Sequence, residues 1–192
     1  MEDDRIKWDS RYAAEGFFLG PHPSPFLMER IDLIKSVCPG RIALDIACGE
    51  GRNSIFLARQ GFSVTGIDIS TEGIVKASRW AVAERLEIAF LVADLETYEF
   101  TGNWDLIINF NFLLRGLIPR AVAALNPGGV MVVDTILDSP FLPGEHTKAY
   151  LLQPGELKGL FADFPGKVLQ YEEHLLDSAP TAKLIFCKSG VK

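Results

Sequence analysis

Cysteine and histidine are scarce in this 192-residue sequence, and neither is spaced as a metal site or a disulfide framework requires. Its three cysteines, Cys38, Cys48 and Cys187, lie far apart and form no CxxC pair. The three histidines are scattered as well. Zinc sites and disulfide scaffolds need close or regular spacing, so we expect no bound metal and reduced cysteines.

The sequence also lacks a long apolar run and a cluster of basic residues. No apolar stretch approaches the roughly 20 residues that span a bilayer. The first residues, MEDDRIKWD, are acidic and contain no apolar core, unlike a secretory signal. The formal net charge of -6 disfavours nucleic acid as a partner, because phosphate contacts need clustered Lys and Arg. We therefore expect a cytoplasmic protein that binds neither membranes nor nucleic acid.

What the sequence does contain is an alternation of apolar runs and amphipathic segments. Strands are predicted at residues 41–47, 62–68, 86–94, 104–110 and 130–136, and helices at 24–37, 53–60, 71–85 and 119–125. Strands separated by helices pair in parallel through right-handed crossovers, which predicts an open α/β sheet covered on both faces. After a short helix at 153–161, the stretches 167–175 and 181–189 are joined by a short polar link, which predicts an antiparallel hairpin.

The stretch DIACGEGRNS, residues 45–54, joins the first predicted strand to its helix. Gly49 and Gly51 allow the backbone to bend sharply there and to approach a ligand without a Cβ atom in the way. A P-loop would need a lysine that this turn lacks. A dinucleotide-binding turn would need a third glycine where Ser54 stands. An NAD-binding oxidoreductase therefore stays only as an alternative.

An acidic residue stands at the end of each of the first three predicted strands: Asp45, Asp68 and Asp94. Asp45 creates negative potential before the turn, which suits a cationic ligand and repels a pyrophosphate. Asp68 can accept hydrogen bonds from both hydroxyls of a ribose, and Asp94 from an adenine amino group. The pattern favours a cationic ligand that carries adenosine. As alternatives, Asp45 holds the turn itself, Asp68 caps a helix, and Asp94 is a surface loop residue.

Taken in order, these motifs resemble those of class I S-adenosylmethionine-dependent methyltransferases. LDIACGEGRN is similar to the family's first motif, VTGIDIS to the segment with the ribose-binding acid, VADLE to the adenine-binding segment, and WDLIINF and LNPGGVMVVDTI to the motifs of the fourth and fifth strands. The resemblance implies a Rossmann-like, seven-stranded mixed sheet, mostly parallel with a reversed C-terminal strand and helices on both faces. The stretch KWDSRYAAEGFFLGPHPSPFL further resembles the tellurite-resistance and thiopurine-type branch, whose members act on small or inorganic soft nucleophiles.

The resemblance also implies S-adenosylmethionine as the cofactor, and a set of residues that bind it. They come from the N-terminal segment, the glycine turn and the strand ends: Arg11, Tyr12, Asp45, Ala47, Cys48, Gly49, Gly51, Asn53, Asp68, Ile69, Ala93, Asp94, Leu95 and Asn109. Residues 1–192 would form a single domain, with a lid and a helix over 1–37 and the Rossmann-like core over 38–192. Within the lid, Arg11 would pair with the cofactor's carboxylate and Tyr12 would exclude water.

The methyl acceptor and any catalytic residue stay undefined, as does the oligomeric state. A soft acceptor such as a thiol or a chalcogen oxyanion needs little beyond in-line alignment. A hydroxyl acceptor would need a general base, for which His22 and His146 are the candidates. Cys48 has no evident base beside it, which disfavours a nucleophilic role. Residues 137–156 are expected to close over the acceptor, and a non-catalytic cofactor-binding protein stays as a further alternative.

Overall fold

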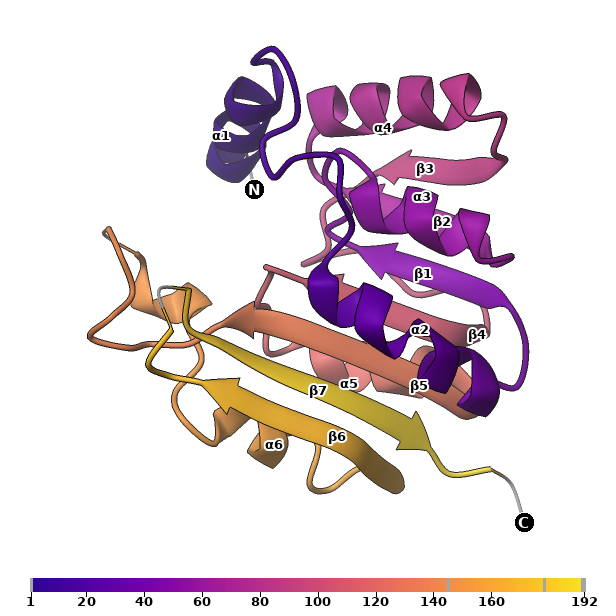
Figure 1. Cartoon of the computed structure of the whole chain (residues 1–192), viewed down its shortest axis with the longest axis vertical. Helices are drawn as coiled ribbons and strands as arrows, with labels where there is room; N and C mark the ends of the chain where they lie inside the picture. Colours follow the sequence, from indigo (N-terminus) through magenta and orange to yellow (C-terminus); the bar gives the residue numbers. More distant parts are fainter. Residues whose placement is uncertain (1, 145, 178, 191–192) are drawn as a thin grey trace. The chain divides into compact units, whose positions relative to one another are not determined.

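The computed structural model describes residues 2–144, 146–177 and 179–190 (Figure 1). These residues form two compact units. The first extends to Ser36 and includes Arg41–Thr101, and the second consists of Val37–Gly40 and the described residues from Gly102 onward. Within the described ranges, no helix is long and apolar enough to cross a membrane.

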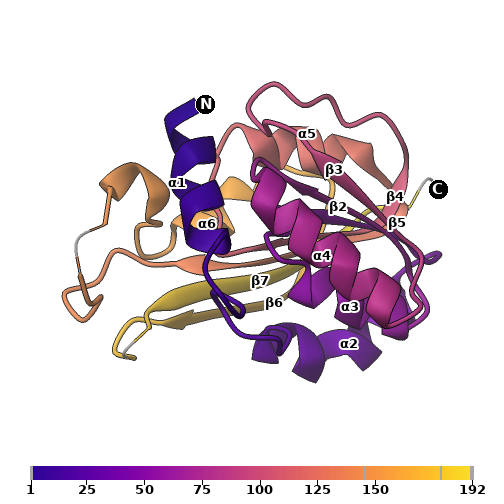
Figure 2. The same ribbon diagram turned by 90° about the horizontal axis from the view of Figure 1, so that it is seen from above.

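The first unit holds three parallel strands with helices packed against them. Its elements are α1 (Glu2–Tyr12), α2 (Pro25–Val37, which ends at the boundary of the unit), β1 (Ile42–Ile46), α3 (Arg52–Arg59), β2 (Ser63–Asp68), α4 (Thr71–Ala83) and β3 (Ile88–Val92). The strand order is β3-β2-β1, and both pairs are parallel. Helices α3 and α4 pack on these strands and on each other, and α1 packs on α4 (Figure 2).

Local sequence signals explain the ends of these elements. The predicted cap of α4 is confirmed, because the Ser70 hydroxyl accepts a hydrogen bond from the Gly73 amide at 3.0 Å. The predicted stop after α3 is confirmed too, since Gly61 adopts a left-handed conformation with φ of 86° just beyond the helix. In β1, Ala43, Leu44 and Ile46 are fully buried, as expected of a strand covered on both faces.

Helix α1 was not predicted as a helix, because its sequence carries no continuous apolar stripe. Charged groups stabilise it instead. Arg5 forms ion pairs with Glu2 and with Asp9 along the helix. Asp9 also reaches the start of α4, where Oδ1 accepts from the Ser70 hydroxyl at 2.6 Å and from the Glu72 amide at 3.1 Å. The helix is therefore held by a partner 61 residues away, which no local pattern reveals.

The second unit contains the remaining four strands. Its elements are β4 (Trp104–Phe110), α5 (Leu117–Ala124), β5 (Leu125–Ile136), the 3-10 helix η1 (Lys148–Tyr150), α6 (Glu156–Leu160), β6 (Gly166–His174) and β7 (Thr181–Lys188). The order is β4-β5-β7-β6, with β4 parallel to β5, and β7 antiparallel to both β5 and β6. The predicted C-terminal hairpin is confirmed. Every residue of β4 is buried, so this strand contributes to the core.

The predicted start of β5 was wrong. The prediction extended the helix to Leu125 and began the strand at residue 130, but Leu125 already pairs with Trp104. The register of β4 and β5 shifts just after this pair. Gly128 has a φ of 79°, and a Cβ atom on Gly129 would lie 2.9 Å from two backbone oxygens. These glycines let the strand continue through an irregularity where a loop was expected.

Candidate functional site

The loop between β1 and α3 turns through residues in the left-handed conformation. Ala47, Gly49 and Gly51 have φ values of 54°, 54° and 83°. The turn is closed by the Gly51 amide, which donates to the Cys48 carbonyl at 2.9 Å. A Cβ atom on Gly51 would lie 2.8 Å from the Cβ of Ala77 in α4. Glycine is thus required at position 51 both by its conformation and by the closeness of α4.

Asp68, the last residue of β2, connects three of the predicted segments. Its Oδ2 atom accepts from the Gly49 amide at 2.7 Å, and Oδ1 accepts from the Ser70 amide at 2.9 Å. Its backbone carbonyl accepts from the amide of Ala93, just after β3, at 2.9 Å. The glycine turn, the end of β2 and the residues after β3 therefore meet at Asp68.

The Asp68 carboxylate is buried, with 6% of the residue exposed. Burial raises the pKa of this carboxyl, while the hydrogen bonds from the Ser70 and Gly49 amides lower it in part. A carboxylate offers about four lone-pair positions; the Gly49 and Ser70 amides use one on each oxygen, and the Ile69 amide is a further, weaker donor. Asp68 thus keeps acceptor capacity toward a ligand hydroxyl, which fits the ribose of an adenosine-bearing ligand.

Asp45, the penultimate residue of β1, faces the first turn of α3. Its Oδ2 atom accepts from the Ser54 hydroxyl at 2.6 Å, and the residue is 1% exposed. Burial raises the pKa of Asp45 to about 7, against the Ser54 hydrogen bond, which lowers it. This geometry supports the alternative in which Asp45 holds the turn. A contact between Asp45 and a ligand stays a prediction.

The Tyr12 ring covers two glycines at the end of α1. A Cβ atom on Gly49 would lie 2.6 Å from the Tyr12 hydroxyl, and one on Gly73 would lie 2.9 Å from the ring. Burial, followed by the negative charge of Asp68, raises the pKa of Tyr12, so the phenol stays protonated and able to donate. This position is compatible with the predicted water-excluding role, which stays a prediction.

Arg11 is exposed beside Tyr12, and aromatic rings hold its side chain. The guanidinium lies 4.8 Å from the ring centroid of Trp8 and 5.4 Å from that of Phe18. Trp8 and Phe18 also contact the Tyr12 ring, at centroid distances of 5.4 Å and 6.2 Å. Cation–π contacts of this kind orient a guanidinium without neutralising it, so Arg11 keeps its charge available for an anion.

Side chains of the glycine turn bind the N-terminal segment, residues 13–24, a function that the sequence did not predict for them. Asn53, predicted to bind the cofactor, accepts from the Ser24 amide through Oδ1 at 2.9 Å. Arg52 donates to the carbonyl of Leu19 at 3.2 Å. Glu50 accepts from the Phe18 amide at 2.7 Å. Partners about 30 residues away leave no periodic signal, although an acid between two glycines marks Glu50 as unusual.

The other predicted site residues of the first unit lie within the glycine turn or directly after β2 and β3. Asp94 accepts from the Glu96 amide through Oδ1 at 2.9 Å, and Leu95 is buried, whereas Ile69 is half-buried. Cys48 is buried, and both burial and the charges of Asp45 and Asp68 raise the pKa of its thiol. A protonated thiol is a poor nucleophile. Adenine contacts by residues 93–95 stay a prediction.

Asn109 lies at the end of β4 in the second unit and is 1% exposed. Its Oδ1 atom is buried and has no hydrogen-bond partner within the described part of the chain. An unsatisfied buried amide oxygen costs free energy that a donor from a ligand would recover. A ligand-binding role for Asn109 stays a prediction.

The sequence is similar to a known protein family and to bacterial proteins. The family described as Tellurite resistance protein TehB matches residues 22–182. A probable S-adenosyl-L-methionine-dependent methyltransferase TehB of Haemophilus influenzae is 26% identical over 152 residues, covering 76% of this chain and 52% of that protein. Hemagglutinin 1 of Eikenella corrodens is 26% identical over 149 residues, covering 74% and 49%. The chain spans about half the length of these two relatives.

Solved structures agree on the fold. The crystal structure of TehB from Haemophilus influenzae superposes with a TM-score of 0.72 at 23% identity, covering 84% of this chain and 62% of that one. Magnesium protoporphyrin IX methyltransferase from Synechocystis PCC 6803, with bound SAH, gives 0.70 at 17% identity and covers 98% and 99%. The predicted Rossmann-like methyltransferase fold, a mixed sheet of seven strands with an antiparallel C-terminal strand, is thus confirmed. The chain belongs to the TehB family of class I S-adenosylmethionine-dependent methyltransferases.

Proposed function

We propose that this protein transfers a methyl group from S-adenosylmethionine to a small-molecule acceptor with a soft nucleophilic atom, such as a thiol or a chalcogen oxyanion. The observation that carries the proposal is Asp68, a buried carboxylate at the end of β2 that binds the Gly49 amide. It keeps acceptor capacity toward the ribose of an adenosine. Family membership supports the same cofactor.

The chain's own residues would bind and shield the cofactor. Asp68 would hold the ribose and Asp94 the adenine amino group, and Asp45 in its ionised form would contribute negative potential for a cationic group. The Tyr12 ring and the Arg11 guanidinium, both on α1, would exclude water and bind the carboxylate. When bound, S-adenosylmethionine supplies an activated methyl group, whose bond to sulfur breaks as its bond to the acceptor forms. Alignment and exclusion of water are then the main tasks of the protein.

A soft acceptor is supported by the environment of the histidines. Within the described ranges, the histidine–carboxylate contacts are those of His174, the last residue of β6, with Glu172 in the same strand and with Asp177 after it. His22 is exposed, and His146 contacts the carbonyl of Pro143. An acceptor that is already nucleophilic at neutral pH needs no general base.

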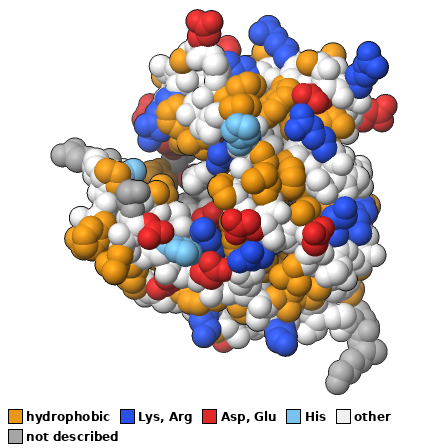
Figure 3. Space-filling view, viewed as in Figure 1, with side chains coloured by type: hydrophobic (Ala, Val, Ile, Leu, Met, Phe, Trp, Pro, Cys, Tyr) orange, Lys and Arg blue, Asp and Glu red, His pale blue; other side chains and the backbone are white. Residues whose placement is uncertain are grey.

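The proposal includes a small-molecule acceptor, a cytoplasmic location and a single domain in which residues 1–37 act as a lid. The net charge of -6 supports a partner other than nucleic acid. On the face shown in Figure 3, acidic and basic side chains are interspersed with hydrophobic ones. The hydrogen bonds between the glycine turn and residues 18–24 support the lid.

Isothermal titration calorimetry with S-adenosylhomocysteine tests the proposal, with NAD as the competing ligand. We expect micromolar binding of S-adenosylhomocysteine to the wild type and to Asp163→Ala, which removes an exposed carboxylate just after α6. Asp68→Ala should abolish binding. Positive results justify a screen of thiol, selenite and tellurite acceptors. No binding to the wild type overturns the proposal, and binding of NAD instead identifies an oxidoreductase.

A further inference from the structure

We propose that Lys76 and Glu50 are positioning residues that hold the N-terminal segment, residues 13–24, on the glycine turn and thereby set the affinity for the cofactor. Both side chains lie outside the set predicted from the sequence. Neither is expected to touch the reacting atoms, so their effect passes through the segment. Because this role is defined for cofactor binding, it rests on the proposed function.

Lys76, in α4, uses all of its hydrogen-bonding capacity on the segment and the turn. Its Nζ atom donates to the carbonyl of Ala14 at 2.6 Å, to the carbonyl of Gly16 at 2.7 Å and to Oε1 of Glu50 at 3.0 Å. An ammonium group has three N–H donors, so this set is complete. The N–H donors of an ordinary surface lysine form hydrogen bonds with water. Lys76 instead fixes the chain path just after Tyr12.

Glu50 completes the connection from inside the turn, between Gly49 and Gly51. Its Oε2 atom accepts from the Phe18 amide at 2.7 Å, while Oε1 receives Lys76. The Glu50 side chain is 7% exposed. A buried carboxylate is stable only when it is paired and hydrogen-bonded, so Glu50 and Lys76 depend on each other. The segment therefore cannot detach from the turn without exposing Glu50 and Lys76 to water or breaking their hydrogen bonds to it.

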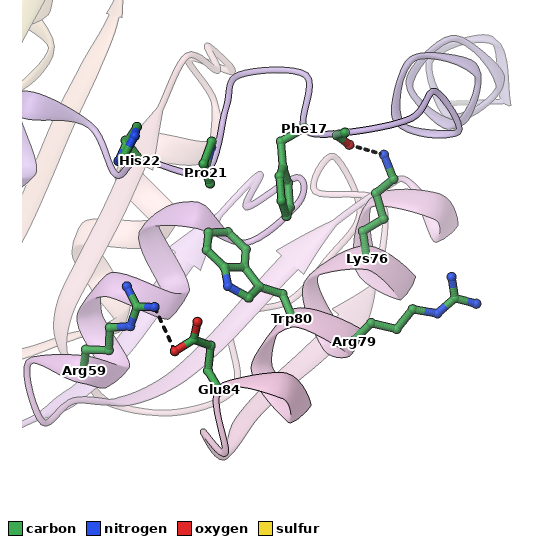
Figure 4. Close-up of a pocket in the computed structure, with 9 residues that line it drawn as sticks. Phe17, Pro21, His22, Arg59, Lys76, Arg79, Trp80 and Glu84 are labelled. Carbon is green, nitrogen blue, oxygen red and sulfur yellow. Dashed lines mark hydrogen bonds and ion pairs between the residues drawn. The ribbon is translucent and has the colours of Figure 1, made fainter.

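Figure 4 shows the outer side of the same connection, a groove of about 670 Å³. The Phe17 ring packs on the Trp80 ring of α4 at a centroid distance of 4.8 Å. Arg59 is paired with Glu84 at 2.8 Å. Trp80 and Arg59 are thus already occupied by contacts within the chain. We therefore interpret this groove as part of the anchor of the segment and not as a second ligand site.

The segment is coupled to the cofactor site at both of its attachments. Tyr12, which covers Gly49, directly precedes it, and Glu50 lies within the glycine turn. Releasing the segment therefore frees the residue that covers the turn and leaves a buried carboxylate in the turn without its cation. If only about a tenth of the molecules keep the segment in place, the apparent dissociation constant rises about ten-fold.

The test compares Lys76→Met with Arg79→Met, a matched control on the same helix. Arg79 is exposed and points away from the Phe17–Trp80 contact (Figure 4). We expect Lys76→Met to weaken S-adenosylhomocysteine binding about ten-fold in calorimetry, and Arg79→Met to leave it unchanged. Hydrogen–deuterium exchange should rise across residues 13–24 in Lys76→Met while β1 and β2 stay protected. Lys76→Arg, which retains a cation, should recover part of both losses.

The outcomes separate this inference from the proposed function. Unchanged or tighter binding by Lys76→Met, in a wild type that binds S-adenosylhomocysteine, overturns the positioning role. Faster exchange in β1 and β2 as well as in the segment also overturns it, because the substitution then acts on the whole unit. If the wild type does not bind S-adenosylhomocysteine, the proposed function fails and the positioning role for the cofactor fails with it. In that case the exchange data still report whether the pair anchors the segment.

Discussion

Asp45 and Asp68 are buried carboxylates near the ends of paired strands, yet they have different partners. Asp45 accepts mainly from a side-chain hydroxyl, that of Ser54 in α3, and more weakly from the backbone amide of the same residue. Asp68 accepts from two backbone amides, those of Gly49 and Ser70. The sequence places the same residue type near the carboxyl ends of two neighbouring strands, and the fold supplies Asp45 with the Ser54 side chain and Asp68 with the glycine turn.

Their different hydrogen-bond partners give these two carboxylates different roles. Asp45 faces inward to the first turn of α3, and its pKa of about 7 makes it change protonation state near neutral pH. Asp68 joins the backbone of three segments and retains free lone pairs toward a ligand. We expect Asp45 to control stability and pH response, and Asp68 to control ligand binding.

The largest expected effect is on binding, in Asp68→Asn. The amide NH₂ group replaces one acceptor oxygen and faces a backbone N–H donor, so both an existing hydrogen bond and a ribose contact are lost. We expect S-adenosylhomocysteine affinity to fall about 100-fold, or about 2.7 kcal/mol. Calorimetry on Asp45→Asn provides the comparison. Equal losses in the two variants would contradict the division of work between these acids.

The next effect is on stability, in Ser54→Ala. Removing the hydroxyl leaves the buried Oδ2 atom of Asp45 without this donor, which costs about 2 kcal/mol. The loss should be greater at pH 8, where Asp45 is ionised, than at pH 5. Urea unfolding at the two pH values measures it, with Ser63→Ala, at an exposed position in β2, as the control. A loss that does not depend on pH would show that the hydroxyl serves another partner.

A smaller effect concerns the pH dependence of the wild type. The pKa of Asp45 is raised from 3.8 to about 7, so the folded state binds a proton that the unfolded chain releases. The stability contributed by this proton is present below the unfolded pKa and is lost as pH rises through 7. Between pH 6 and pH 8, this group should lower the free energy of unfolding by roughly 1 kcal/mol. Asp45→Asn should remove this part of the slope, and an unchanged slope would assign it elsewhere.

The smallest effect is expected for Ser70→Ala. This variant tests whether ligand binding depends on the Ser70 hydroxyl or only on the Ser70 backbone amide, which contacts Asp68. The substitution removes the α4 cap and the hydrogen bond to Asp9, and should cost about 1 kcal/mol of stability. The Ser70 amide still reaches Asp68, so S-adenosylhomocysteine affinity should be retained. Thermal unfolding and calorimetry measure the two quantities. A large loss of affinity would mean that α1 depends on this hydroxyl for its position.

Much of the fold and of the centre of the site could be predicted from local signals. Apolar runs, a serine cap and glycine stops identify β1, α4 and the end of α3, because burial and capping act over a few residues. The meeting of the glycine turn with Asp68 follows from strand order, since parallel strands bring their carboxyl ends to one edge. These features need no knowledge of distant contacts.

The features that the sequence did not reveal depend on long-range partners. Helix α1 is held through Asp9 by residues 61 and 63 positions away, and Glu50 meets Phe18 across 32 positions. In the sequence, Lys76 is indistinguishable from a solvated surface lysine, and only the structure shows its three acceptors. The early start of β5 depends on pairing with Trp104. Each of these features depends on tertiary contacts, which the local secondary-structure propensities of the residues do not contain.

The burial of Cys48 has a chemical consequence for a protein proposed to hold an electrophilic methyl donor. A Cβ atom on Gly66 would lie 2.9 Å from the Cys48 sulfur, so the thiol is packed tightly against β2. The thiolate is the reactive form of cysteine, and the raised pKa of Cys48 keeps it protonated. The proposed methyl transfer to a soft acceptor would thus take place in a protein whose own glycine turn holds a soft sulfur atom, and burial would keep that atom from reacting with the methyl donor.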